Sequence, residues 1–471
     1  MKEKTKYFAK NLFLFSLSGF VPKALAFILV PLYTNYLTTA EYGIADLITV
    51  TVSLLLPLAT LNIQDAVMRY SLEEDSDPGE VLSIGLKTVL NGGIFIIVLA
   101  LIAGMICDIE HFPLYLFFGV LTYFTSALNN ILNFFCRAVD HVSAITVSSI
   151  INSAVMLLGN IIFVAVLRMG LSGYLISSVL GPFVAVLYIF FSVKIYRYIK
   201  KECSVDLRRQ MLQFSAPLII GSIAWWINNS LDRYMITFFI GVSASGLFAI
   251  SSKIPNILVM FQQIFSQAWS ISAIKEFDRD DGDGFIGKTY TVLNMIMILV
   301  CSGIIMMDVP LAYILYSKDF FQAWLYVPPL LLTCVFNAMA LFINSLFIAV
   351  KDTKARMKAT VVGMLVNVIC NLILIQVIGV YGAALSTMIS GAVSFVASHF
   401  YLKKYIRMKT RKCREAIAYF MLIVQMILAL WGTKTIPLQL VIFLILIVFY
   451  RTEIRYFLSH MRRSKSSEVS E

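Results

Sequence analysis

The sequence predicts an all-α polytopic membrane protein with about fourteen transmembrane helices. Of its 471 residues, 59% are hydrophobic and only 14% are charged, and the mean hydropathy is +0.83. A soluble protein of this length would have nearer a quarter of its residues charged. Long apolar runs recur from one end of the chain to the other, and about 20 apolar residues suffice for a helix to cross a bilayer.

The apolar runs place the helices along the chain. Because the first run follows basic residues and continues to Leu37 without a small-residue cleavage site, we expect a retained helix and not a signal peptide. Two short runs near the C-terminus predict a closing hairpin, since each is close to the minimum length of a span. The expected spans are 10–37, 44–67, 84–106, 113–136, 143–167, 171–193, 213–240, 243–271, 289–307, 322–350, 357–378 and 380–402, with the hairpin at 416–431 and 436–450.

The distribution of Lys and Arg predicts the orientation, because cytoplasmic loops carry an excess of basic residues. With the N-terminus in the cytoplasm, all but six of the 38 basic residues fall at predicted cytoplasmic ends. The exceptions are Arg168, Lys318 and Lys434 in external loops, and Lys23, Arg233 and Lys253 inside predicted spans. The net charge of +11 therefore indicates topology and not a nucleic-acid partner, and both termini are expected in the cytoplasm.

The two halves of the chain resemble each other. LTTAEYGIADL (37–47) is similar to IGVSASGLFAI (240–250), and GLSGYLIS (170–177) is similar to GVYGAALS (379–386). Transporters use such repeats to build a central site between them. We expect a six-helix N-terminal half at 1–205, a parallel six-helix half at 206–412, and a helical hairpin with a cytoplasmic tail at 413–471.

The sequence contains no motif of a catalytic or metal-binding site. Its seven cysteines are scattered without a C-x-x-C pair, and its four histidines are isolated. A nucleophile elbow, a phosphate loop and an H-E-x-x-H motif are all missing from it. The acidic loop EFDRDDGDG (276–284) lacks the ligand spacing of an EF-hand, so we expect a solvated loop. We therefore expect neither an enzyme nor a bound cofactor or metal.

Polar stripes run along several predicted helices, on residues three or four apart that share one face. Lipid cannot satisfy such stripes, so they are expected to face one another or water. The alternative for Ser, Thr and Asn is that they only join helices together. The main stripes are Ser215, Ser222, Trp226, Asn229 and Arg233 on the seventh helix, Lys253, Asn256, Met260, Gln263 and Gln267 on the eighth, and Asp46, Thr49, Ser53, Pro57, Thr60 and Gln64 on the second.

Ionisable residues within the spans are the strongest candidates for a substrate site, because a charge at membrane depth must face protein or water. Asp232 and Arg233 are adjacent and point about 100° apart, so Asp232 is expected to pair with Lys253 across the turn. A purely structural role for Asp232 is the alternative. With Lys23 included, one such pairing leaves an excess of two positive charges, which favours an anionic substrate.

With these residues in view, the chain resembles the polysaccharide (oligosaccharide-lipid) flippase family of the MOP superfamily, over residues 10–405. The most specific segments are LVPLYTNYLTTAEYGIADL, AVMRYS, SLDRYMI, GLFAISSKIP and FSQAWSISA. The resemblance implies a MATE-like, V-shaped bundle of two halves around a cationic cavity that opens alternately to either side. It also implies that Lys23, Arg233 and Lys253 contact a diphosphate or an acidic sugar, and that Arg69 lies at the cytoplasmic mouth.

The implied activity is the transfer of undecaprenyl-diphosphate-linked oligosaccharide units from the cytoplasmic to the outer leaflet of a bacterial plasma membrane. Asn229, Asn256 and Gln263 would offer hydrogen bonds to sugar hydroxyls, and Asp46 is a candidate charge partner or gating residue. The expected partners are the lipid-linked oligosaccharide, membrane lipids, a polysaccharide polymerase and glycosyltransferases, with no nucleic acid. The sequence does not indicate the sugar or the energy source.

Three other functions are the alternatives, and a feature of the sequence counts against each. A lipid II flippase would carry several arginines in its first helix, where this chain has one lysine. A multidrug or cation antiporter of the MATE type would carry a carboxylate there, and residues 10–37 contain no Asp or Glu. A membrane-embedded glycosyltransferase or ligase would have catalytic carboxylates or large external loops, and the loops expected outside are short.

Overall fold

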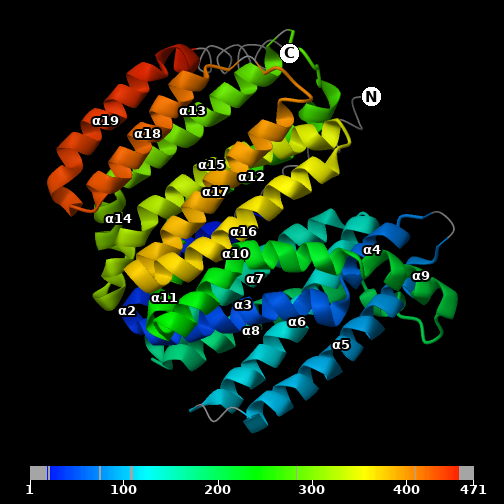
Figure 1. The fold of residues 1–471 in the computed structure, drawn as a ribbon. Helices are drawn as coiled ribbons and strands as arrows, with labels where there is room; N and C mark the ends of the chain where they lie inside the picture. The colour runs from blue at the N-terminus through cyan, green and yellow to red at the C-terminus, as the bar shows by residue number, and fades with distance from the viewer. Residues whose placement is uncertain are drawn as a thin grey trace, which may run out of the picture. The chain divides into compact units, whose positions relative to one another are not determined.

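The computed structural model describes residues 19, 22–73, 76–106, 110–282, 284–408 and 410–455. In this part of the chain the regular structure is helical and no strand occurs, which confirms the predicted fold class. Packing divides the chain into two compact units, Met1–Tyr234 and Met235–Glu471 (Figure 1). The predicted boundaries at 205/206 and 412/413 stay a prediction.

The first unit consists of antiparallel helices joined by short turns (Figure 1). Its elements are α2 (Val30–Tyr36), α3 (Thr39–Thr60), α4 (Ile63–Tyr70), α5 (Pro78–Ile106), α6 (Phe112–Ala138), α7 (Val142–Gly159) with the π-helical continuation η1 (Asn160–Val166), α8 (Gly170–Ser192), η2 (Ile195–Arg197), α9 (Val205–Ser215) and most of α10 (Leu218–Phe239). The last residues of α10 belong to the second unit.

Helix α3 begins five residues before the predicted start because Thr38 caps it. The Thr38 hydroxyl accepts a hydrogen bond from the Glu41 backbone N–H (3.2 Å), and the Glu41 carboxylate accepts one from the Thr38 N–H (2.8 Å). This reciprocal capping box satisfies two N–H groups that a helix terminus otherwise leaves unpaired. Glu41 also accepts a hydrogen bond from the Leu171 N–H (3.2 Å), which joins the start of α3 to the start of α8.

The predicted single helix 44–67 is wrong, because the chain breaks between α3 and α4. Leu61 and Asn62 both adopt left-handed backbone conformations, with φ of 53° and 51°. Asparagine tolerates this conformation better than most residues. Asn62 is also held by a hydrogen bond from its side-chain amide to the Ser222 hydroxyl (3.0 Å). A contact with α10, distant in sequence, therefore helps to fix the break.

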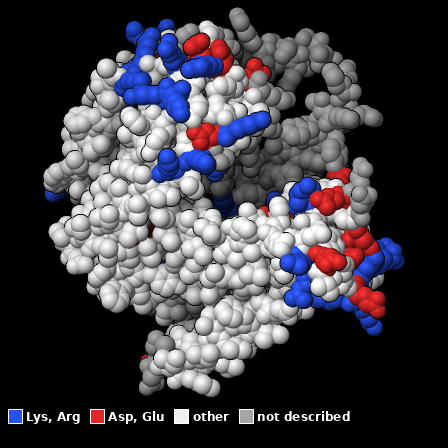
Figure 2. Space-filling model, turned by 45° about the vertical axis from the view of Figure 1, so that its right-hand side comes forward, with Lys and Arg blue, Asp and Glu red and all other residues white. Residues whose placement is uncertain are grey.

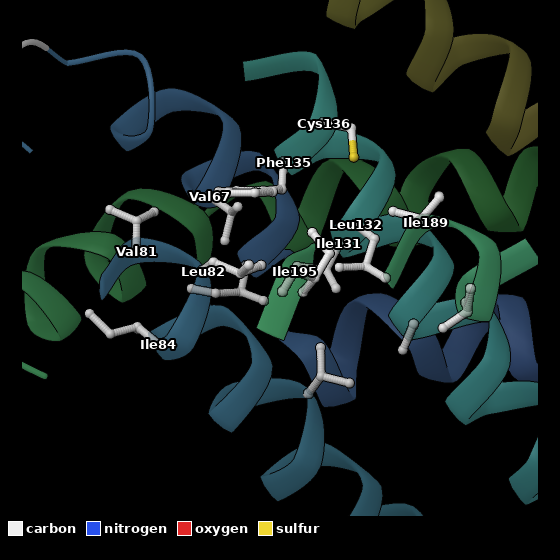
Figure 3. Packing of buried hydrophobic residues seen from close by; sticks show 14 of the residues in the cluster. Val67, Val81, Leu82, Ile84, Ile131, Leu132, Phe135, Cys136, Ile189 and Ile195 are labelled. Atoms are coloured by element: carbon white, nitrogen blue, oxygen red, sulfur yellow. The ribbon is translucent and has the colours of Figure 1, made fainter. Parts of the chain in front are cut away.

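The apolar core of the first unit lies where α4, α5, α6 and η2 meet (Figure 3). Val67, Leu82, Ile131, Phe135 and Ile195 are almost fully buried there. Close approach of α5 to its neighbours depends on Gly92, because a Cβ at this position would collide with the Ala59 carbonyl oxygen and the Tyr123 hydroxyl. The opposite half of α5 exposes a row of large apolar side chains, as expected of a lipid-facing surface: Ile94, Phe95, Ile97, Val98, Leu101 and Ile102.

The second unit contains α11 (Val242–Ser251), α12 (Asn256–Lys275), α13 (Phe285–Met306), α14 (Asp308–Leu315), η3 (Lys318–Tyr326), α15 (Val327–Ala349), α16 (Thr353–Ile378), α17 (Val380–Leu402), α18 (Lys412–Ala429), η4 (Gly432–Thr435) and α19 (Ile436–Phe449). The acidic loop before α13 caps that helix: the Asp281 carboxylate accepts hydrogen bonds from the N–H groups of Ile286 and Gly287, both at 3.0 Å. Helices α18 and α19 form the expected closing hairpin and pack on α13.

Helices α11 and α12 form one bent element where the sequence predicted a continuous helix over 243–271. Their axes differ by 51° across a break of four residues, 252–255. Pro255 lacks an N–H and restricts the residue before it, which explains why α11 does not continue through this point. The prediction of a straight span is therefore wrong here.

Among the described residues, ten helices are long and apolar enough to cross a membrane, or eleven if α11 and α12 count as one broken span. Two more predicted spans, α10 and α18, carry several charged or amide side chains. The remaining predicted span, 10–37, lies partly outside the described residues. A multi-pass membrane protein is thus shown, and the number fourteen stays a prediction.

Candidate functional site

An ion pair joins α10 to α3 inside the first unit. The Arg233 Nε donates a hydrogen bond to the Asp46 carboxylate at 3.0 Å, and the Arg233 Nη1 donates one to the Asn229 carbonyl at 3.0 Å. The two charged side chains are only 16% and 20% exposed. A pair with so little water around it interacts much more strongly than a surface pair.

Further hydrogen bonds connect the same two helices. The Trp226 indole N–H donates to the Val50 carbonyl (2.9 Å), and the hydroxyls of Thr51 and Tyr234 bond to each other. The spacing of polar residues predicts Trp226 on a polar face of this helix, whereas it does not indicate Thr51 or Tyr234. The indole N–H bonds to a backbone carbonyl, and such an acceptor leaves no signal in the sequence pattern.

The ion pair lies well inside the two helices. Arg233 is six residues before the last residue of α10, and Asp46 is seven residues after the first residue of α3. At 1.5 Å per residue, both lie roughly 10 Å from the helix ends that are predicted to be external. Because Asp46 neutralises Arg233, the predicted excess of two positive charges falls to one when Asp46 is counted.

The other candidates of the first unit occupy different environments. Asp232 is almost fully buried, at 3% exposure, next to the pair on α10. Lys23 lies half-buried in the helical stretch 22–28. Arg69 is exposed on α4 and forms an ion pair with Glu73, one helical turn later, at 3.1 Å. The structure therefore brings together Arg233, Asp46 and the Asn229 carbonyl, whereas Arg69 pairs locally.

In the second unit the candidates gather around the break between α11 and α12. Lys253 lies in the break itself, partly buried, and its N–H bonds to the Ile250 carbonyl at 3.0 Å. Asn256 is exposed at the first position of α12, and Gln263 is exposed two turns further along. A non-helical stretch at membrane depth is tolerated where protein or a water-filled cavity covers it, and transporters use such stretches for binding.

Several hydroxyls of the predicted stripe on α3 bond to their own helix. Thr49, Ser53 and Thr60 each donate to a backbone carbonyl three or four residues earlier, at 3.0, 2.7 and 2.8 Å. The side-chain amide of Asn229 likewise donates to the Trp225 carbonyl at 2.7 Å. These contacts satisfy the hydrogen-bonding groups of the side chains without a ligand. The charged residues of the stripes are therefore the stronger candidates for substrate binding.

The sequence is similar to that of known proteins of polysaccharide synthesis. The family described as polysaccharide biosynthesis protein matches residues 8–274. A probable low-salt glycan biosynthesis flippase, Agl15, of Haloferax volcanii is 24% identical over 214 residues. That match covers 44% of this chain and 45% of the relative, so the chain spans less than half the length of the curated relative it matches.

Two solved structures share the fold. The lipid II flippase MurJ in an inward closed conformation superposes with a TM-score of 0.69 at 16% identity, covering 94% of this chain and all of the other. An inward-facing multidrug resistance MATE family transporter of the MOP superfamily gives a TM-score of 0.66 at 14% identity, covering 85% of this chain and 98% of the other. At such identities the likeness establishes the fold alone.

Proposed function

Since the chain belongs to the polysaccharide biosynthesis protein family, we propose that it flips lipid-linked oligosaccharides from the cytoplasmic to the outer leaflet of its membrane. The observation that carries the proposal is the ion pair of Arg233 on α10 with Asp46 on α3, which lies roughly 10 Å from the helix ends predicted to be external, in a protein of this family. The partial relative is named as a probable glycan flippase and the MurJ structure as a lipid II flippase, and both names support the same class of substrate.

A diphosphate must lose its water to cross about 30 Å of hydrocarbon. Charge-assisted hydrogen bonds from lysine and arginine can replace the lost hydration. We assign this role to Lys23, Arg233 and Lys253, and we assign hydrogen bonding of sugar hydroxyls to Asn229, Asn256 and Gln263. Arginine suits phosphate because its planar fork can donate two parallel hydrogen bonds.

Asp46 would act as the resting partner of Arg233. In the absence of substrate it holds the guanidinium in place and neutralises its charge. An incoming diphosphate carries more negative charge than one carboxylate, so it would compete for the guanidinium. Such an exchange would keep the excess of positive charge small while the site is empty and make the guanidinium available to the substrate, and alternating access would carry the bound group across.

The proposed function implies a membrane, an orientation in it and a set of partners. We propose a bacterial plasma membrane, both termini in the cytoplasm, and a polysaccharide polymerase and glycosyltransferases as partners in the same process. Cysteine labels at 38–42 and 433–435 would then react from outside intact cells, and labels at 280–283 and 407–411 would not. Equal labelling of the two sets would contradict the proposed orientation, and with it the assigned direction of flipping.

Deletion of the gene tests the function. Cells without the protein should accumulate prenyl-linked oligosaccharide and lose a surface polymer, with unchanged sensitivity to cationic dyes such as ethidium. Normal surface polymer with raised ethidium sensitivity would favour the MATE-type antiporter. Loss of cell-wall synthesis with normal surface polymer would favour a lipid II flippase.

A further inference from the structure

We propose that the end of α17 and the start of α18 bind one anionic diacyl phospholipid of the cytoplasmic leaflet, at a site separate from the residues assigned to substrate. Two adjoining cavities of the second unit carry the proposal. One is small and basic and would hold the phosphate, and the other is an apolar groove that would hold an acyl chain.

The basic cavity has a volume of about 220 Å³ and includes Lys403, Arg407 and Lys412 in its lining. All three side chains are exposed, and none of the described residues that line the cavity is a carboxylate. Helix α18 starts at Lys412, which lines the cavity, and the start of this helix has no side-chain cap. Three basic side chains and a helix N-terminus together favour a phosphate group. Figure 2 shows Lys and Arg gathered in the upper part of the view.

The apolar groove has a volume of about 540 Å³ and runs along α17 against α15, α16 and α18. Its lining includes Phe336, Val362, Val396, Phe400 and Ile423. From its first to its last lining residue on α17, 388–401, the groove follows the helix for roughly 20 Å. This is somewhat more than one leaflet of a hydrocarbon core about 30 Å thick.

Side chains that line the two cavities contact each other. The Lys403 ammonium of the basic cavity lies 5.9 Å from the ring centroid of Phe400, which lines the groove. His399 of the basic cavity also contacts Phe395, with ring centroids 6.4 Å apart, and Phe395 stacks on the groove residue Phe336 at 6.3 Å. A phosphate in one cavity and a chain in the other would therefore belong to one amphiphilic molecule.

Both the charge and the length of the site select among lipids. Positive charge favours phosphatidylglycerol over phosphatidylcholine, whose headgroup carries its own cation. A groove about one leaflet deep matches a phospholipid acyl chain, whereas an undecaprenyl chain is much longer. We therefore assign the site to a membrane phospholipid and not to the transported carrier lipid.

The test uses the purified full-length protein in phosphatidylcholine nanodiscs, with phosphatidylglycerol titrated in and bound lipid counted by native mass spectrometry. Simultaneous Lys403→Gln, Arg407→Gln and Lys412→Gln should weaken phosphatidylglycerol binding by about 100-fold, given the usual contribution of each basic residue near a lipid headgroup. The matched control removes three exposed charges on the first turns of α16, which line neither cavity: Lys354→Gln, Arg356→Gln and Lys358→Gln. The control should change binding far less.

A second variant tests the groove. Ala392→Phe fills it without altering charge, so it should weaken phosphatidylglycerol binding while a thermal melt shows an intact protein. Equal losses from both triple variants would overturn the proposal, as general surface charge would then explain binding. Displacement of the lipid by inorganic phosphate at matched concentration, or preference of the site for a prenyl diphosphate, would also overturn it.

Discussion

The ion pair between Arg233 and Asp46 allows a structural role to be separated from a binding role. Asp46→Asn removes the carboxylate but keeps a side chain of the same shape, and Arg233→Gln removes the guanidinium charge. The double variant removes both charges together. If the pair only stabilises the fold, the double variant should recover both the melting temperature and the polymer export that the single variants lose.

The expected magnitudes follow from the burial of the pair. Removing one partner of a buried ion pair costs about 3–5 kcal/mol, and the residual exposure of 16% and 20% places this pair near the lower end. For a unit the size of Met1–Tyr234, 3 kcal/mol corresponds to a fall in melting temperature of about 6 °C. Arg233→Gln should cost less than Asp46→Asn, because an unpaired aspartate can take up a proton.

The assay combines thermal unfolding of the purified protein with surface polymer measured in a deletion strain. We expect the double variant to recover most of the lost melting temperature but none of the lost export. Asp46→Asn alone should keep export, since the guanidinium remains. Arg233→Gln should reduce export strongly, as one lost charge-assisted hydrogen bond is worth roughly 1.5–3 kcal/mol.

Two results would refute this reasoning. Additive falls in melting temperature would show that the two side chains are not coupled. Wild-type export from the double variant would show that Arg233 has no role in binding, and with it the proposed cationic contact would fail.

Three other predictions concern single positions. Lys253→Gln should abolish export without lowering the melting temperature, whereas Lys253→Arg should keep part of the export; a large fall in melting temperature would indicate a structural role instead. Gly92→Ala should destabilise the protein, because its Cβ would collide with a carbonyl oxygen, while Gly119→Ala on α6 has room and should be neutral or slightly stabilising in the same melt. Asp308→Asn should raise the melting temperature at pH 7, because burial raises the pKa of this carboxyl well above its usual value and neither of its oxygens has a hydrogen-bond partner among the described residues. This gain should disappear near pH 4, where the unfolded chain also binds the proton, and an equal gain at both pH values would contradict the explanation.

Helix positions were predictable because apolar runs and lipid thickness constrain them strongly. The start of α3 was also visible in the sequence, since Thr38 and Glu41 have the spacing of a capping box, although the expected span began later. The break at Leu61 and Asn62 was not visible, as no glycine or proline marks it. It depends on a hydrogen bond to Ser222, which is 160 positions away in the sequence.

The candidate site was predictable in its members but not in its pairing. Periodicity identified Asp46 and Arg233 as residues on polar helix faces, and their separation of 187 positions hid the contact between them. The sequence named Asp46 as a candidate charge partner without saying of which residue, and it proposed a specific pair only for Asp232 with Lys253. Periodicity shows which face of a helix a residue occupies, but it does not show which other helix that face meets.

The short helix α11 has a consequence for how the cell makes this protein. With ten residues, α11 is only about 15 Å long, half of what a membrane crossing requires. As one broken span, α11 would leave the translocon together with α12, and Lys253 would enter the bilayer between them. A lysine at the centre of a segment opposes insertion by about 2.5–3.5 kcal/mol. This segment should thus insert less efficiently alone than behind its natural neighbours, and biogenesis of the second unit would depend on helices that are already in the membrane.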